Sequence, residues 1–337
     1  MTKLIIVSTY FTLTTLVSVA SADVLNVPGD FDRIEDAVDA AAPGDVIEVE
    51  SGVYTGRTEI RDASSLTLRG VDTGSGLPIV RPGAGEDGFR VRESSDIVIT
   101  GFRFEGGERG VRVRDVSTDI EIVANEFDGV EVGIRIRGGS GHIVLGNEIR
   151  NSLTGGGIRV REASNVQVDG NTLANLADDG IRVRESSDVT VTGNDIGEVT
   201  GDGIDVREST NVVVGNVALG GNVSSANSEN GIRVKDSTGI AIAENTTSDN
   251  IRYGIRVRNT TPIDEVADLT AANNAAECNG FGDFRVGSEI VSNDCPGGST
   301  TSTSTSSTTT STTTSSTTTS LAVTTTSVSS TTSSTLP

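Results

Sequence analysis

Three aspartates and two basic residues are spaced so that they could form one chemical site. Asp179 and Asp202 are 23 residues apart, and Asp205 follows three residues after Asp202. Carboxylates are ligands that Ca²⁺ prefers. A lysine among arginines has a lowered pKa, as the base of a polysaccharide lyase requires. If the protein is such a lyase, the candidate metal ligands are Asp179, Asp202 and Asp205, and the candidate catalytic residues are Asp202, Asp205, Lys235 and Arg233. No other cofactor is expected.

Arginines recur at two positions of a repeated pentapeptide, Gly-x-Arg-x-Arg. The first position is held by Arg90, Arg112, Arg135, Arg159, Arg182, Asp205, Arg233 and Arg256. The second position is held by Arg92, Arg114, Arg137, Arg161, Arg184, Arg207, Lys235 and Arg258. Guanidinium groups in register can bind sugar hydroxyls or uronate carboxylates. The residues expected to contact such a ligand are Arg135, Arg159, Arg161, Arg182, Arg184, Arg207 and Arg256.

The alternative is that these arginines pair with acidic residues and bind no ligand. An acid follows most of the second positions, as Glu185 follows Arg184, and others precede the glycine, as Asp179 precedes Gly180. Neighbouring cations about 5 Å apart repel by roughly 0.8 kcal/mol in water, so some partner must screen them. A solvated lattice of ion pairs would do so without any ligand.

The elements that would position these side chains follow from the period of the repeat. The glycine of the pentapeptide recurs at steps of 22 to 24 residues from Gly88 to Gly254, with one step of 28. Such a period is typical of a solenoid. After each glycine apolar and polar residues alternate, which predicts that Ile181 and Val183 face the interior and the arginines face solvent. A second alternating stretch and a lone apolar position give three short strands per repeat.

Asparagines recur 13 to 15 residues after these glycines, at Asn125, Asn147, Asn171, Asn194, Asn216 and Asn245. Stacked on coils about 4.8 Å apart, their side chains would form a hydrogen-bonded ladder. The pattern predicts an all-β fold, a parallel β-helix with three strands per coil. The five extra residues of the long repeat are expected in a loop over 219–230, in the coil that carries Asp205.

The two ends of the chain are expected to differ from the coils. Residues 1–22 have the charge, apolar run and small-residue site of a signal peptide. Residues 23–70 are expected to form the first coils and a short amphipathic helix over 31–42 that caps the solenoid. The β-helix is expected over 71–297 and a Ser/Thr-rich disordered linker or stalk over 298–337. Cys278 and Cys295 are expected to form a disulfide, because an exported chain can oxidise its only two cysteines.

Several of these segments resemble one superfamily. Val27-Pro-Gly-Asp-Phe31, Ala37-Val-Asp-Ala-Ala-Ala-Pro-Gly-Asp45 and Gly52-Val-Tyr54, with the coils that follow, are similar to the pectin lyase-like superfamily, in particular its NosD-type repeat proteins. The resemblance implies a right-handed helix and a saccharide cleft on the arginine-rich sheet. It leaves the activity open, since this scaffold carries lyases, hydrolases, esterases, epimerases and non-catalytic surface proteins.

Composition narrows the function further. A net charge of −21 argues against a nucleic-acid partner, and one histidine argues against a histidine-ligated metal or a histidine-based triad. No transmembrane segment is expected in the mature chain. The leading hypothesis is a monomeric secreted, periplasmic or cell-surface module that contacts a polysaccharide or cell-surface glycan or serves a structural role. The alternative is a lyase or epimerase that acts on uronate-rich glycans, with Ca²⁺ if it is a lyase.

Overall fold

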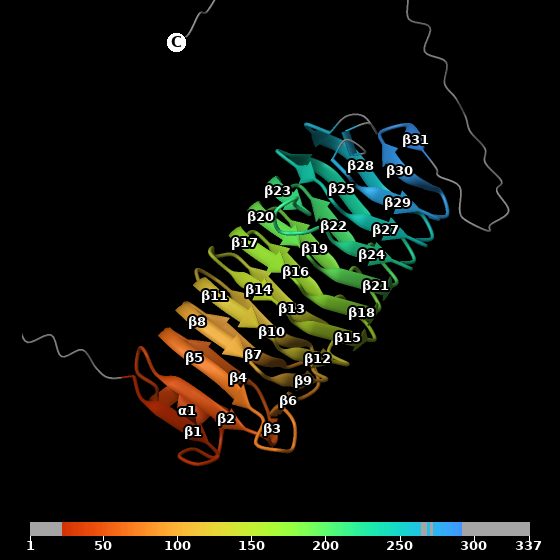
Figure 1. Cartoon of the computed structure of the whole chain (residues 1–337). Coiled ribbons are helices and arrows are strands. Elements are labelled where there is room, and N and C mark those ends of the chain that lie inside the picture. Colours follow the sequence, from red (N-terminus) through yellow and green to blue (C-terminus); the bar gives the residue numbers. More distant parts are fainter. Residues whose placement is uncertain (1–21, 264–267, 270–271, 292–337) are drawn as a thin grey trace, which may run out of the picture. The chain divides into compact units, whose positions relative to one another are not determined.

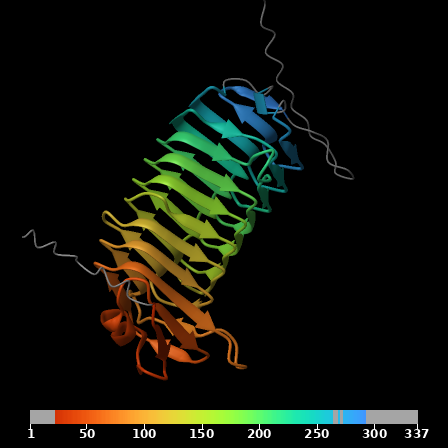
Figure 2. The ribbon, with the colours of Figure 1, turned by 60° about the vertical axis from the view of Figure 1, so that its left-hand side comes forward.

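The computed structural model describes residues 22–263, 268–269 and 272–291. In this part of the chain successive coils stack on one another, and each coil contributes three short strands (Figure 1). Strands at equivalent positions of successive coils pair in parallel, so rows of strands run along the stack (Figure 2). The pairings group the strands into three such rows. The predicted all-β parallel β-helix with three strands per coil is therefore confirmed.

Row 1 is the set of strands that carries the pentapeptides. It consists of β4 (Thr58–Arg61), β7 (Asp87–Arg92), β10 (Arg109–Arg114), β13 (Val132–Arg137), β16 (Ile158–Arg161), β19 (Ile181–Arg184), β22 (Ile204–Arg207), β25 (Ile232–Thr238), β28 (Tyr253–Thr261) and β30 (Gly282–Val286). A further strand, β31 (Glu289–Val291), pairs with β30 in the antiparallel sense.

Rows 2 and 3 complete each coil. Row 2 consists of β1 (Val24–Val27), β2 (Val46–Glu50), β5 (Ser64–Val71), β8 (Ser95–Thr100), β11 (Thr118–Val123), β14 (Ile143–Leu145), β17 (Ser164–Asp169), β20 (Ser187–Thr192), β23 (Thr210–Val214) and β26 (Ala241–Ile242). Row 3 consists of β3 (Val53–Thr55), β6 (Ile79–Arg81), β9 (Arg103–Glu105), β12 (Glu126–Asp128), β15 (Glu148–Ser152), β18 (Thr172–Leu176), β21 (Asp195–Val199), β24 (Val223–Ser225), β27 (Thr246–Ser248) and β29 (Ala275–Glu277).

The core follows from the alternation within each strand. In β19 Ile181 and Val183 are fully buried, and the two arginines of the same strand point outward. The pattern repeats on every coil because each strand pairs in register with the next, so that Ile158 lies beside Ile181 and Val160 beside Val183. Outward residues of row 1 therefore form two continuous columns, the first and second positions of the pentapeptide, along the stack.

A ladder of buried asparagines holds the turn between rows 2 and 3. Asn171 donates through Nδ2 to Oδ1 of Asn194 at 2.9 Å, and Asn194 donates in the same way to Asn222 at 2.9 Å. Each asparagine also donates to backbone carbonyls, so the buried amides are satisfied. The residues of this ladder are Asn125, Asn147, Asn171, Asn194, Asn222, Asn245 and Asn274.

The prediction that Asn216 belongs to this ladder is wrong. Asn222 takes the position, because it donates to Asn245 and accepts from Asn194. The extra residues lie just before it, where Asn216 and Gly220 form a small antiparallel bridge between β23 and β24. The expected loop over 219–230 is therefore misplaced: the insertion occupies the turn between rows 2 and 3, away from the turn that leads into row 1.

The predicted capping helix is present as α1 (Ile34–Ala40), which buries Ile34, Ala37 and Val38 against the first coils. No helix among the described residues has the length and apolar character needed to cross a membrane. The predicted signal peptide, apart from Ala22, and the Ser/Thr-rich tail lie outside the described residues. So does Cys295, the expected partner of Cys278 in a disulfide.

Candidate functional site

The first column of row 1 carries the candidate site. It runs in strict register, so that Arg159 pairs with Arg182, Arg182 with Asp205 and Asp205 with Arg233 on successive strands. The arginines of this column are half-buried, because each lies between the long side chains of the coils on either side. The prediction that these side chains face outward is confirmed, and their exposure is intermediate.

Asp205 interrupts this column with a short acidic side chain. Its carboxylate is fully buried, because the longer arginines of the neighbouring strands reach over it. Arg207 donates through Nε to Oδ1 at 2.7 Å. The second oxygen, Oδ2, is buried and accepts no hydrogen bond, although Arg184 Nη2 lies 3.6 Å and Arg182 Nε 3.7 Å away. A buried acceptor that lacks a hydrogen bond is uncommon in native proteins.

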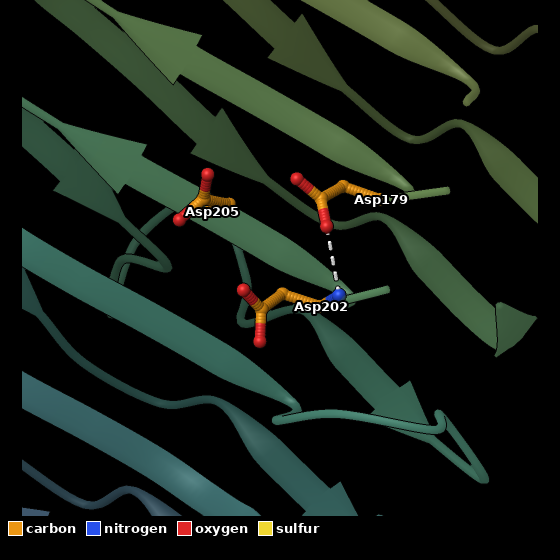
Figure 3. Close-up of side chains that lie close together, drawn as sticks. All are labelled: Asp179, Asp202 and Asp205. Atoms are coloured by element: carbon orange, nitrogen blue, oxygen red, sulfur yellow. Dashed lines mark hydrogen bonds between the residues drawn. The ribbon is translucent and has the colours of Figure 1, made fainter. Parts of the chain in front are cut away.

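Asp179 and Asp202 join Asp205 from the turn that leads into row 1. Each stands immediately before the glycine of its pentapeptide, and both are almost fully buried. The Asp202 backbone N–H donates to Asp179 Oδ1 at 2.8 Å, and this bond is the dashed line in Figure 3. The three carboxylates point toward one another in Figure 3, and oxygen atoms of all three lie within 4.8 Å of one another. The sequence-predicted clustering of these aspartates is thus observed.

Arginines surround the acidic cluster, which we define as Asp179, Asp202 and Asp205. Arg182 donates to Asp179 Oδ2 at 2.6 Å, and Arg233 Nη1 lies 3.4 Å from Asp202 Oδ2. These arginines come from the same coils as the aspartates or from adjacent coils, so the pairing follows from the register of row 1. The cluster is therefore a mixed site, in which carboxylates are central and guanidinium groups form the wall.

Burial and neighbouring charges raise the pKa of two carboxyl groups in the cluster. Burial raises the pKa of Asp179 to about 6, and the charges of Asp205 and Asp202 add to this effect against the opposing charge of Arg182. Burial also raises the pKa of Asp205, against the hydrogen bond from Arg207. Asp179 can thus exchange a proton near neutral pH, a property that is common among functional carboxyl groups.

An open hollow of about 270 Å³ lies above the cluster. Its lining is charged, polar or small, and it consists of Ala177, Asp178, Asp179, Arg182, Thr200, Gly201, Asp202, Arg207, Glu229 and Arg233. Asp205 is not part of this lining, because it lies beneath the arginines. A ligand that entered the hollow would meet many donors and acceptors and no aromatic ring.

The other predicted residues lie around this site or further along the face. Arg233 lines the hollow, whereas Lys235 is not among its lining residues and its Nζ pairs with Asp236 Oδ2 at 2.7 Å. Arg159 pairs with Asp178 at 2.7 Å, and Arg161 pairs with Glu185 at 3.0 Å.

The remaining predicted arginines differ in what they contact. Arg184 and Arg207 contact Asp205, as described above, whereas Arg256 lies over the ring of Tyr253 with its Cζ 5.7 Å from the ring centroid. Arg135 makes neither a hydrogen bond nor an ion pair with any described residue.

Three further residues contribute to this face, of which Asn230 and Arg285 were not expected from the sequence. Asn230 donates to Asp202 Oδ1 at 2.6 Å and extends the line of Asp179 and Asp202 by one coil. Asp178 accepts from both Arg159 and Arg182 at 2.7 Å. Arg285 continues the first column, since it pairs in register with Arg256. Asn230 could have been found from its place directly before Gly231, which matches the places of Asp179 and Asp202.

The cluster offers a donor set that partly suits Ca²⁺. Three carboxylates within one ion's reach, one with an unbonded buried oxygen, match the oxygen ligands that this ion prefers. The arginine wall counts against it, since each of the three carboxylates already has a guanidinium group within 3.4 Å. A divalent cation would have to compete with these ion pairs.

The fold and the sequence together define the class of protein. The chain belongs to the right-handed β-helix family, whose model, described as a right handed beta helix region, matches residues 109–276 and 157–333. Its fold is that of the pectin lyase-like superfamily. The narrower NosD-type resemblance stays a prediction. A search of curated protein sequences finds no significant match.

Solved structures with this fold are distant in sequence. The enzymatically active domain of Bacteriophage CBA120 tailspike protein 2 has 15% identity and a TM-score of 0.59, over 79% of this chain and 46% of that one. The DFA-IIIase from Arthrobacter chlorophenolicus A6 without its lid, in complex with GF2, has 16% identity and a TM-score of 0.55, over 72% and 74%. Pectate lyase Pel9A has 15% identity and a TM-score of 0.51, over 76% and 80%. The chain thus spans less than half of the tailspike domain, and these likenesses concern the fold.

Proposed function

We propose that this protein is an exported β-helix that binds a polysaccharide or cell-surface glycan on row 1, with the acidic cluster and its arginines as the centre of the site. The observation that carries the proposal is the hollow of about 270 Å³ above the cluster, which is lined by charged, polar and small residues. A sugar presents hydroxyl groups that both donate and accept. Carboxylates and guanidinium groups in one hollow supply acceptors and donors for such a ligand.

The regularity of the face supports a chain-like ligand. Strands of row 1 stack about 4.8 Å apart, so equivalent side chains recur at a spacing that an extended saccharide can follow. The fold likeness to a tailspike domain and to pectate lyase Pel9A is compatible with this role. Export is part of the proposal, and it rests on the signal-peptide pattern of residues 1–22.

Binding can be tested with the full chain on an array of neutral and anionic glycans, followed by calorimetry on the glycans that bind. We expect the Arg182→Gln variant to lose affinity, because Arg182 lines the hollow and holds Asp178 and Asp179 in place. The matched control is Arg150→Gln, which removes an arginine from row 3. No binding by the wild type would leave the protein with a structural role. Wild-type binding by both variants would place the glycan site away from the hollow.

A second candidate, a lyase or epimerase acting on uronates, is favoured by the raised pKa of Asp179 to about 6 and by the convergence of three carboxylates. Arg233 lies in the hollow and is placed better than Lys235 to meet a ligand. The test is the release of unsaturated uronates from pectate or alginate with and without Ca²⁺, together with an NMR assay for epimerised residues. Turnover that is lost in Asp202→Asn and retained in Arg150→Gln would establish catalysis. Glycan binding without any product would exclude it.

A further inference from the structure

Arg135 differs from most arginines of row 1. Among the described residues of this row only Arg256 and Arg258 likewise lack an ion pair and a hydrogen bond, and Arg256 lies over the ring of Tyr253 while Arg258 is exposed. No described residue places a carboxylate oxygen within 4.0 Å of the Arg135 guanidinium group or accepts a hydrogen bond from it. The side chain is nevertheless half-buried in the first column, between Arg112 and Arg159 in register. An arginine held in this way presents its donors to whatever lies above the sheet.

The two arginines beside Arg135 in the first column pair with carboxylates on other coils. Arg112 pairs with Asp87, which lies on the preceding coil, and Arg159 pairs with Asp178, which leads into the following one. Neither neighbour therefore shares a carboxylate with Arg135. Burial lowers the pKa of Arg135, and repulsion from nearby arginines, including Arg112 and Arg159, lowers it further.

The local sequence explains why no partner is present. Arg90 and Arg182 each pair with an aspartate three residues earlier, but the residue three before Arg135 is Val132. On the next coil the equivalent position is Gly156, where an added Cβ would lie 2.4 Å from the backbone oxygen of Asp179. A side chain cannot be accommodated at Gly156. Neither Val132 nor Gly156 can therefore supply a carboxylate to Arg135.

We propose that Arg135 binds an oxyanion of the glycan, a carboxylate or a sulfate ester, so that the ligand of this face is an acidic saccharide. This inference rests on the proposed glycan binding and adds its chemical class. Arg135 lies two coils from Arg182 in the hollow, about 10 Å at the spacing of stacked strands. One extended chain can therefore occupy the hollow and place an acidic substituent over Arg135. A guanidinium group without a protein partner can form a charge-assisted pair with that substituent.

Two variants test the role of Arg135 by different routes. Arg135→Gln removes the cation, and Val132→Asp gives it the partner that Arg90 and Arg182 have. Each is expected to weaken binding of a uronate or sulfated oligosaccharide about tenfold, the loss of one charge-assisted hydrogen bond. Binding of a neutral oligosaccharide of equal length should stay within about twofold.

The matched controls are Val132→Asn, which changes the same site without charge, and Arg258→Gln, which removes an exposed arginine that forms no ion pair with a described residue. Both should bind acidic oligosaccharides like the wild type, and circular dichroism would confirm that all four variants fold. Separate uronate and sulfated probes decide which oxyanion is bound. Wild-type affinity for acidic oligosaccharides in Arg135→Gln and Val132→Asp would overturn the inference.

The test also separates this inference from the proposed function. If the wild type binds neutral and acidic oligosaccharides equally, glycan binding stands and the acidic class is wrong. If no glycan binds, a thermal-shift titration with sodium sulfate, compared with sodium chloride at equal ionic strength, tests whether Arg135 still binds an oxyanion. A rise in Tm with sulfate that is larger in the wild type than in Arg135→Gln would retain the oxyanion site without glycan binding, and equal rises would refute both.

Discussion

Two buried groups of aspartate and arginine lie on row 1. Guanidinium groups outnumber carboxylates in the first, whereas several carboxylates converge in the second. Near the N-terminal coils a single fully buried carboxylate, that of Asp87, meets three guanidinium groups. Arg90 donates to it at 2.7 Å, Arg109 at 2.9 Å and Arg112 at 3.5 Å. In the acidic cluster three carboxylates converge and the arginines stand around them.

The difference appears in the proton affinity of the carboxyl groups. Burial acts to raise the pKa of Asp87, but the hydrogen bonds and charges of Arg109 and Arg90 outweigh it and hold the pKa below its ordinary value. The pKa values of Asp179 and Asp205 are instead raised. Identical residue types at equivalent strand positions thus give a neutralised ion pair in one place and a poised acid in the other. The comparison indicates that Asp87 stabilises the fold, whereas the acidic cluster is suited to a ligand or a proton.

The sharpest test of this comparison is Asp87→Asn. It leaves Arg90 and the largely buried Arg109 without their shared carboxylate, and loss of one partner of a buried ion pair costs about 3 kcal/mol. Urea unfolding should show a loss of this size. The control is Asp128→Asn on row 3, whose partly exposed carboxylate pairs with Arg103 and should cost less than about 1 kcal/mol. Equal losses in the two variants would remove the structural role assigned to Asp87.

The next prediction concerns pH. The folded pKa of Asp179, about 6, exceeds its ordinary value of 3.8, so the folded state binds a proton that the unfolded state releases between these values. The stabilisation is complete below pH 3.8 and is lost as the pH rises through 6. Between pH 7.5 and pH 5 the wild type should therefore gain about 1.5 kcal/mol of unfolding free energy relative to Asp179→Asn.

Asp87→Asn provides the reference for this pH experiment. Because the folded pKa of Asp87 is lowered, its contribution changes only below about pH 4 and should be constant between pH 5 and pH 7.5. The measurement is urea unfolding of the three proteins in one series of buffers. A constant difference between the wild type and Asp179→Asn would show that Asp179 is ionised throughout this range.

Sequence spacing predicted the backbone well, because a stacked coil repeats its constraints. The glycine period and the alternation of β19 were enough to place Ile181 inside and Arg182 outside, and a spacing of 23 residues was enough to bring Asp179 beside Asp202. The one failure lay where the period breaks. Asn216 stands at the expected distance from Gly203, and only the stacking of Asn222 between Asn194 and Asn245 shows which asparagine is used.

Charge pairing was much less predictable than register. Arg135 has an acidic residue four positions before it, Glu131, and spacing alone would pair the two, yet they form no ion pair. A long side chain can reach carboxylates on its own coil or on either neighbour, and the choice depends on rotamers and on which carboxylates are already paired. The lack of an ion pair at Arg135 and the buried Oδ2 of Asp205 therefore result from side-chain packing, which residue spacing in the sequence does not specify.

The smallest expected effect is the change in unfolding free energy caused by Asp205→Asn. This variant distinguishes the acidic cluster from the group around Asp87 most directly. Because the fold raises the pKa of Asp205, it disfavours the charged form, and a neutral amide of the same shape should change the unfolding free energy by less than about 1 kcal/mol. Arg207 loses a charged partner but can still donate to the amide oxygen. A loss as large as that of Asp87→Asn would mean that both groups are structural ion pairs. A small loss together with weaker glycan binding would show that the fold tolerates the change and that the carboxylate contributes chiefly to the site.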